Sequence, residues 1–80
     1  MTQQDAFEKM LPLLEDVFGV DASAISEKTD LFADLYGDEM DIVELSMIIE
    51  EEFDFLTDDD EMSRIVTVGD LCSYISRHTD

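Results

Sequence analysis

Apolar residues recur at helical spacing in residues 3–18, and this period predicts the first helix of the chain. The residues that share one face of it are Phe7, Met10, Leu14, Val17 and Phe18. Gly19 follows at once, as glycine commonly does where a helix ends. Pro12 lies inside the helix and removes one backbone donor, so we expect a bend or a local break there.

A second apolar period predicts a helix over residues 39–53, with apolar residues on two sides instead of one. Asp38 is placed to cap this helix, and Glu39 and Asp41 fall in its first turn, where negative charge complements the helix dipole. We assign to the core the side that carries Ile42, Leu45, Ile49 and Phe53. The opposite side carries Met40, Val43 and Met47, with Glu39, Glu44, Glu50 and Glu51 around them.

The opposite side of this helix has two interpretations that the sequence leaves open. Apolar helix stripes are mostly core, which favours a helix buried on both sides. The carboxylates around the stripe oppose burial, because an unpaired buried charge is costly. Methionine adapts to partners of varied shape and acidic residues steer a basic partner, so the same pattern also fits a docking face.

The rest of the chain completes an all-α pattern. Residues 20–37 lack one clean period and predict a long ordered loop, with one or two helical turns over residues 31–35. A short helix is expected over residues 59–64, and a last helix after Thr67, which pairs with Asp70 in a capping box. The expected buried side of the last helix carries Val68, Leu71, Cys72 and Ile75.

The charge balance narrows the classes of partner. The chain has 80 residues, which we take as one domain over residues 1–80, and 22 acidic against four basic residues give a net charge of −18. Phosphates repel such a protein, so we expect no nucleic acid and no membrane insertion, and instead a partner with a basic patch. No apolar run is long enough to span a bilayer and the N-terminus does not resemble a signal peptide, so we expect a cytoplasmic monomer.

Candidate catalytic and metal-binding chemistry is sparse, and we expect neither an enzyme nor a metal site. Cys72 is the one cysteine, so no internal disulfide can form, and we expect a buried thiol. His78 is the one histidine, and we expect it to be a frayed surface residue. The acidic run over residues 58–61 lacks the spacing and the glycine of a calcium-binding loop.

Three segments read DLYGDEMDIVEL over residues 34–45, IEEEF over residues 49–53 and VTVGDL over residues 66–71. Together they resemble the acyl carrier protein family, and the resemblance spans about residues 7–75. It implies a small bundle of three longer helices and one short helix, with a long loop between the first two. It also implies a function, since members of the family carry an acyl chain as a thioester on a phosphopantetheine arm. Their acidic second helix docks on the basic patches of biosynthetic enzymes.

The attachment residue of the family departs from its pattern in this chain. The family has a serine in an Asp-Ser-Leu motif at the start of the second helix, and the matching residues here are Asp38, Glu39 and Met40. A carboxylate has no hydroxyl to attack the pyrophosphate of coenzyme A, so we expect no phosphopantetheine on Glu39. The resemblance can still imply that this chain has the family's docking surface. It would comprise Asp38, Met40, Asp41, Val43, Glu44, Met47, Glu50 and Glu51.

Two further positions differ from the family pattern. Tyr36 stands where the family usually has a glycine, and we expect its ring to pack on the loop. The segment of residues 55–57 is more apolar than usual, and it either lines the pocket that holds acyl chains in the family or covers the core.

Three functions are compatible with these observations. We favour a domain that docks on acyl-transfer or lipid and polyketide biosynthesis enzymes without an arm, with Glu39 mimicking the charge of the arm's phosphate. One alternative is a genuine acyl carrier protein of fatty acid or polyketide biosynthesis, with an engineered Ser-to-Glu change or a displaced attachment serine. The serines that would have to serve, each interpreted first as a cap or surface hydroxyl, are Ser23, Ser26, Ser46, Ser63, Ser73 and Ser76. Another alternative is an acidic decoy that mimics nucleic acid.

Overall fold

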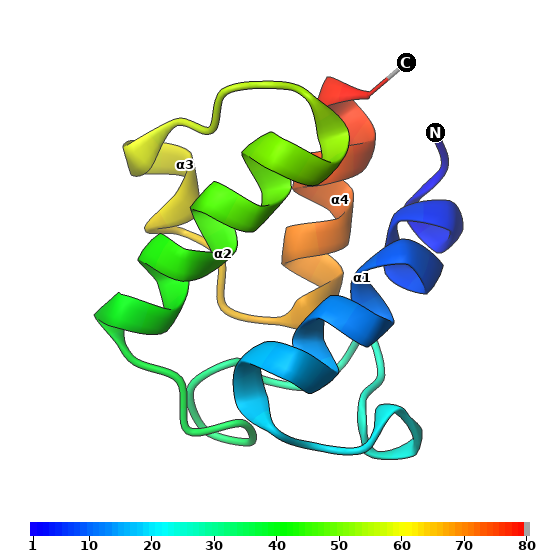
Figure 1. The fold of residues 1–80 in the computed structure, drawn as a ribbon, viewed down its shortest axis with the longest axis vertical. Coiled ribbons are helices and arrows are strands. Elements are labelled where there is room, and N and C mark those ends of the chain that lie inside the picture. The colour runs from blue at the N-terminus through cyan, green and yellow to red at the C-terminus, as the bar shows by residue number, and fades with distance from the viewer. Residues whose placement is uncertain (80) are drawn as a thin grey trace.

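Four α-helices make up most of residues 1–79, the part of the chain that a computed structural model describes (Figure 1). Within these residues the only β-pairing is an isolated bridge between Asp30 and Thr67. The expected all-α, acyl-carrier-like bundle with a long loop between its first two helices is therefore confirmed. The elements in chain order are α1 (Gln3–Phe18), the 3₁₀ turn η1 (Ala22–Ala24), α2 (Glu39–Phe53), α3 (Asp59–Met62) and α4 (Val68–His78).

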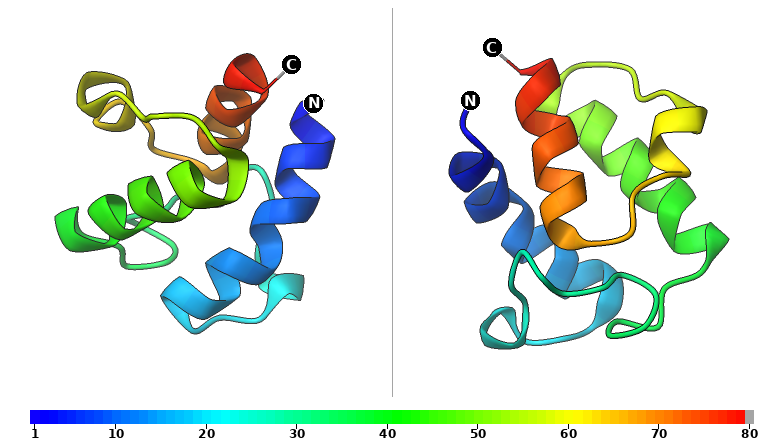
Figure 2. Two further views of the ribbon diagram at one scale, coloured as in Figure 1. Left: turned by 45° about the horizontal axis from the view of Figure 1, so that its top comes forward. Right: turned by 180° about the vertical axis from the view of Figure 1, so that it is seen from behind.

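The first helix has the predicted bounds and is not broken by its proline. Thr2 and Asp5 form a capping box at its start, and Gly19 adopts a left-handed φ of 65° at its end. The helix is continuous through Pro12, which lies on its exposed side, and its axis changes direction along its length (Figure 2). The alternative of a local break at Pro12 is therefore wrong.

Helices α1 and α4 pack side by side (Figures 1 and 2), and Met1 contacts Thr79. The N-terminal ammonium of Met1 donates to the carbonyl oxygen of Thr79 at 2.6 Å, and the Ser76 hydroxyl donates to the Met1 carbonyl at 2.9 Å. These bonds hold the last turn of α4 against the start of α1.

The loop over residues 20–37 is ordered by bonds to the segment before α4. Leu31 N–H donates to Val66 O at 2.8 Å, and Val68 N–H donates to Thr29 O at 2.9 Å. The expected helical turn over residues 31–35 is present, since the chain makes hydrogen-bonded turns there and Asp34 N–H donates to Asp30 O at 3.0 Å. The sequence analysis missed η1, whose cap is the Asp21 carboxylate.

The short third helix is two residues shorter than expected, because it ends at Met62 and not at residue 64. Arg64 N–H donates to Glu61 O, and Ile65 N–H donates to Met62 O. Both bonds span three residues instead of four, so the chain tightens into a turn after α3.

One core joins all four helices. Of the second helix, Leu45 and Ile49 are fully buried, while Ile42 and Phe53 are half-buried and pack against the core. This confirms the assignment of that side of α2. The other large side chains that are fully buried are Tyr74, Met10, Leu14, Leu31, Leu71, Ile75, Val68 and Cys72.

The ring of Tyr36 does not pack on the loop, and that expectation is wrong. Tyr36 has a left-handed φ of 58°, and its side chain is 86% exposed. The next residue, Gly37, donates its N–H to Leu31 O at 2.9 Å, closing a turn in which Leu35 points inward. A left-handed φ is least costly at glycine, which has no Cβ, so the backbone at Tyr36 is strained while its ring stays exposed.

We predict that Tyr36→Gly raises the free energy of unfolding by up to about 1 kcal/mol, because glycine has no Cβ to strain at this φ. Tyr36→Ala keeps the strain and removes only the exposed ring, so it should leave stability nearly unchanged. Urea denaturation of the two variants and the parent measures both effects. A substantial loss of stability in both variants would mean that the ring packs on the protein after all.

Candidate functional site

The start of α2 presents three carboxylates that differ in what they do. Asp38 accepts the N–H of Asp41 at 3.1 Å, and Asp41 accepts the N–H of Asp38 at 3.0 Å. These two side chains thus form the capping box of the helix. Glu39 lies between them in sequence and is exposed, and its side chain has no hydrogen bond or ion pair within residues 1–79. It is therefore the carboxylate that the helix start leaves available to other molecules.

The outer side of α2 is an exposed apolar stripe, which we define as Met40, Val43 and Met47. Their side chains are 74%, 54% and 57% exposed, respectively. Glu44 and Glu51 beside the stripe are exposed as well. Of the two interpretations of this side, burial in the core is therefore wrong. Its use as a docking face stays a prediction.

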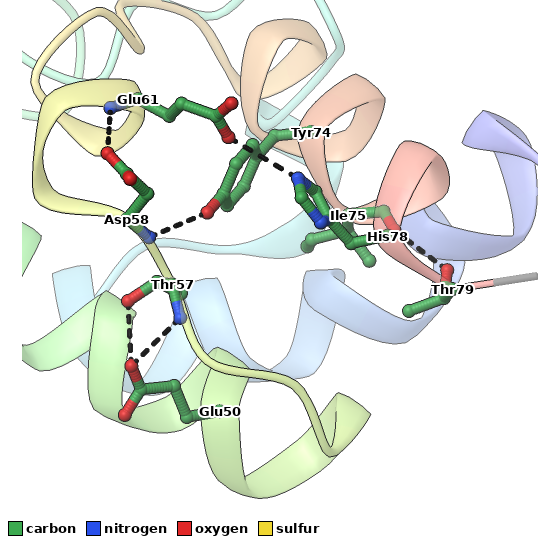
Figure 3. Close-up of polar contacts among 8 residues, drawn as sticks. All are labelled: Glu50, Thr57, Asp58, Glu61, Tyr74, Ile75, His78 and Thr79. Carbon is green, nitrogen blue, oxygen red and sulfur yellow. Dashed lines mark hydrogen bonds and ion pairs between the residues drawn. The ribbon is translucent and has the colours of Figure 1, made fainter.

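Glu50 differs from the other acids of that surface because it is bonded inside the molecule. Its carboxylate accepts the backbone N–H of Thr57 at 3.0 Å and the Thr57 hydroxyl at 2.8 Å (Figure 3). These two bonds lower the pKa of Glu50, since both stabilise the ionised carboxylate. Glu50 thus holds the segment after α2 against the helix. Its expected role in docking stays a prediction.

His78 is a surface residue, as expected, but it is not frayed, because it belongs to a cluster that closes the same segment over α4. Its ring stacks on Phe55 with 5.1 Å between centroids, and its Nε2 lies 3.3 Å from a carboxylate oxygen of Glu61. Asp58 N–H donates to the buried Tyr74 hydroxyl at 2.9 Å (Figure 3). The cluster holds the segment that leads into α3. Within this segment, Phe55 packs against the core, whereas the side chain of Leu56 is 85% exposed.

A cavity of about 500 Å³ lies between α2 and α3, beside Glu39. Of its lining, the sequence analysis had singled out Glu39 and Val43 for the site and Ser46 and Ser63 as alternative attachment serines. It missed Phe32, Asp59 and Met62. The segment of residues 55–57 does not line it. The lining residues are Phe32, Glu39, Ile42, Val43, Ser46, Asp59, Met62 and Ser63.

Both serine hydroxyl groups of this cavity are hydrogen-bonded within the protein. The Ser46 hydroxyl lies 3.1 Å from the Thr57 hydroxyl, and because Thr57 donates its proton to Glu50, Ser46 is the donor. Ser63 donates its hydroxyl to Asp60 O at 2.6 Å. With a carboxylate at the attachment position and both cavity hydroxyls bonded internally, the residues present do not fit a phosphopantetheine ester at the start of α2.

The thiol of Cys72 is buried in α4, as expected, and its burial raises its pKa to about 12. It is therefore protonated near neutral pH and is a poor nucleophile. Within residues 1–79, no group of three or more His, Cys, Asp or Glu side chains is arranged to hold a metal ion. None of the helices described is long and apolar enough to cross a membrane.

Comparison with known proteins agrees with the resemblance seen in the sequence. A family model described as a phosphopantetheine attachment site matches residues 8–75. The acyl carrier protein of Clostridium acetobutylicum is 42% identical over 74 residues, which cover 92% of this chain and 96% of that protein. The acyl carrier protein of Lactobacillus acidophilus is 41% identical over 78 residues, 98% of each chain. That of Thermotoga maritima is 37% identical over 76 residues, 95% of this chain and 94% of the relative.

The two sides of α2 should respond differently to truncation. We predict that Leu45→Ala lowers the free energy of unfolding by about 2–5 kcal/mol, because it opens a cavity in the core. Met47→Ala should cost less than about 1 kcal/mol, because Met47 is largely exposed. Chemical denaturation of both variants provides the comparison. Equal losses would show that the stripe is buried in solution.

Proposed function

The chain belongs to the acyl carrier protein family, and from that premise we propose that it is a member that docks without carrying. In this proposal the exposed side of α2 binds acyl-transfer or lipid and polyketide biosynthesis enzymes, and no phosphopantetheine is attached. The observation that carries the proposal is Glu39, an available carboxylate at the position where the family has its serine. Acyl carrier proteins are carriers and not enzymes, so the loss of the arm leaves partner binding as the function.

The surface around Glu39 supports docking by its charge and its shape. A net charge of −18 attracts a basic patch and speeds its encounter with this protein. The stripe of Met40, Val43 and Met47 then supplies apolar area that a partner can cover. The acids that surround the stripe set its register against the basic residues of the partner.

Glu39 gives this surface a fixed negative charge at the start of α2. In a modified carrier, the phosphate of the arm places negative charge at the same residue. A partner that recognises the modified form by this charge would therefore accept the present protein, although nothing can be transferred to it. Such a protein regulates or scaffolds an acyl-transfer enzyme by occupying its docking site.

Tyr36 extends the proposed surface beyond the residues that the sequence suggested. It lies three residues before Glu39, and its ring is the most exposed large apolar side chain among residues 1–79. Exposed tyrosine is enriched among the residues that contribute most to protein interfaces. A strained backbone that gains nothing from internal packing is consistent with a side chain kept for an external contact.

One mass-spectrometry experiment tests both halves of the proposal. The acyl carrier protein of Clostridium acetobutylicum is incubated with coenzyme A and a permissive phosphopantetheinyl transferase, with and without an excess of this protein. We expect the present protein to gain no mass, because Glu39 offers no hydroxyl. We expect modification of the relative to slow, because the two proteins compete for one docking site on the transferase.

Charge reversal separates docking from general charge effects in this assay. Glu44→Lys, beside the stripe, should weaken the competition, whereas Glu8→Lys, exposed on α1, changes the net charge equally and should not. A gain of one phosphopantetheine on the present protein would refute the non-carrying half, and mapping it to Ser46 would name a displaced site. Unchanged modification of the relative would refute docking on the transferase.

A further inference from the structure

The five methionines of the chain differ sharply in exposure, and the difference follows their place in the fold. Met10 and Met62 belong to the core and are 0% and 3% exposed, respectively. Met40 and Met47 are largely exposed and make up two of the three side chains of the stripe on α2. Met1 is also exposed, but it lies outside the stripe. The surface proposed for docking is thus built mainly from accessible thioethers.

The one thiol of the protein does not compete with these thioethers for an oxidant. Cys72 is fully buried, and its burial raises its pKa to about 12, so it stays protonated near neutral pH. Oxidation of cysteine requires a thiolate that an oxidant can reach. Hydrogen peroxide is uncharged, so the net charge of −18 does not repel it as it repels anionic oxidants. The exposed thioethers are therefore the first groups that peroxide meets.

We propose that Met40 and Met47 form a reversible oxidation site that controls docking, an inference that rests on the function proposed above. The oxidant is hydrogen peroxide. Each thioether sulfur gives an electron pair to one peroxide oxygen, so that an S–O bond forms while the O–O bond breaks. A proton moves to the leaving oxygen, which departs as water. Each methionine is oxidised by two electrons to the sulfoxide, and the peroxide is reduced by the same two electrons.

Sulfoxide formation makes the stripe polar and leaves Val43 as its one apolar side chain. A sulfoxide oxygen accepts hydrogen bonds from water, and an apolar partner surface offers none in exchange. Docking is therefore weakened. The fold is retained, because the side chains of Met40 and Met47 are not part of the core.

Reduction restores the stripe. Methionine sulfoxide reductases act on the sulfoxide, with one enzyme for each of its two epimers. Two thiols of the reductant become a disulfide, and the sulfoxide oxygen leaves as water. Because both side chains project from the exposed side of α2, such an enzyme can reach them without unfolding the domain.

The first measurement locates the oxidation. The folded protein is treated with graded amounts of hydrogen peroxide, the reaction is stopped with catalase, and the peptides are mapped by mass spectrometry. We expect Met40 and Met47 to be oxidised at least about tenfold faster than Met10 and Met62, because a buried sulfur reacts only after local opening. Similar rates at all four residues would refute a selective site, and this result does not depend on docking.

The second measurement asks whether oxidation weakens docking. The oxidised and reduced proteins, freed of peroxide, are compared as competitors in the transferase assay described above. We expect the oxidised form to require at least about fivefold more protein for the same inhibition, because each covered sulfoxide loses its hydrogen bonds to water. Both sulfoxide reductases together with a thiol should restore the original inhibition.

The same assay distinguishes failure of this proposal from failure of the docking proposal. Equal inhibition by the oxidised and reduced forms would overturn control by oxidation and leave docking intact. A reduced protein that does not inhibit would refute docking on the transferase, and control of that docking with it.

A leucine double variant separates the stripe from the other exposed methionine. Met40→Leu combined with Met47→Leu keeps the surface apolar and removes both thioethers, so it should compete like the parent before and after peroxide treatment. Met1 is present in the variant and in the parent, so its oxidation cannot explain a difference between them. Loss of inhibition by the peroxide-treated leucine variant would place the effect elsewhere and overturn the proposal.

A glutamine double variant tests the polarity of the stripe without any oxidant. Met40→Gln combined with Met47→Gln introduces polar side chains of similar length, and it should weaken competition at least about fivefold. The midpoints of urea denaturation of this variant and of the oxidised parent should stay close to that of the reduced parent. A fall in the midpoint of the oxidised parent as large as that of Leu45→Ala would show that oxidation unfolds the domain, and would contradict a local effect on the stripe.

Discussion

Burial of Leu45 and Ile49 in the core fixes the rotation of α2, and the functional features of the protein depend on that rotation. A helix turns once in 3.6 residues, so anchoring these two side chains directs Met40, Val43 and Met47 outward. The capping box of Asp38 and Asp41 fixes where the helix begins, and thereby leaves Glu39 in its first turn with an available carboxylate. The exposed stripe and the position of Glu39 are thus two consequences of one packing arrangement.

The α3 side of the cavity is held in place by polar contacts and not by the length of the helix. α3 has only four residues and could not hold its position by itself. The bonds from Thr57 to Glu50, from Asp58 to Tyr74 and between Glu61 and His78 hold the segment that leads into it (Figure 3). These contacts place Asp59 and Met62 opposite α2, where with Glu39 they define the chemical character of the cavity.

The structural features that the sequence predicted correctly depend on residues that are close together in the chain. The bounds of α1 and α2, the caps at Asp38 and Thr67 and the two sides of α2 all follow from periods and motifs a few residues long. What it missed depends on distant contacts. The left-handed backbone of Tyr36 results from a turn that closes onto Leu31, and the partners of His78 lie 4 to 23 residues away, from Tyr74 back to Phe55. The cavity combines residues 32 to 63 and has no local signature at all.

Restoring the serine tests the central claim most directly, which is that this chain keeps the surface of a carrier and has lost only its attachment group. The Glu39→Ser variant would recreate the Asp-Ser pair of the family at the start of α2, and the adjacent Met40 is a mild replacement for leucine. After incubation with coenzyme A and a phosphopantetheinyl transferase, we expect intact-mass analysis to show one phosphopantetheine on Glu39→Ser, mapped to residue 39. A folded Glu39→Ser protein that stays unmodified would contradict the account, because the docking surface would then not be one that the transferase recognises.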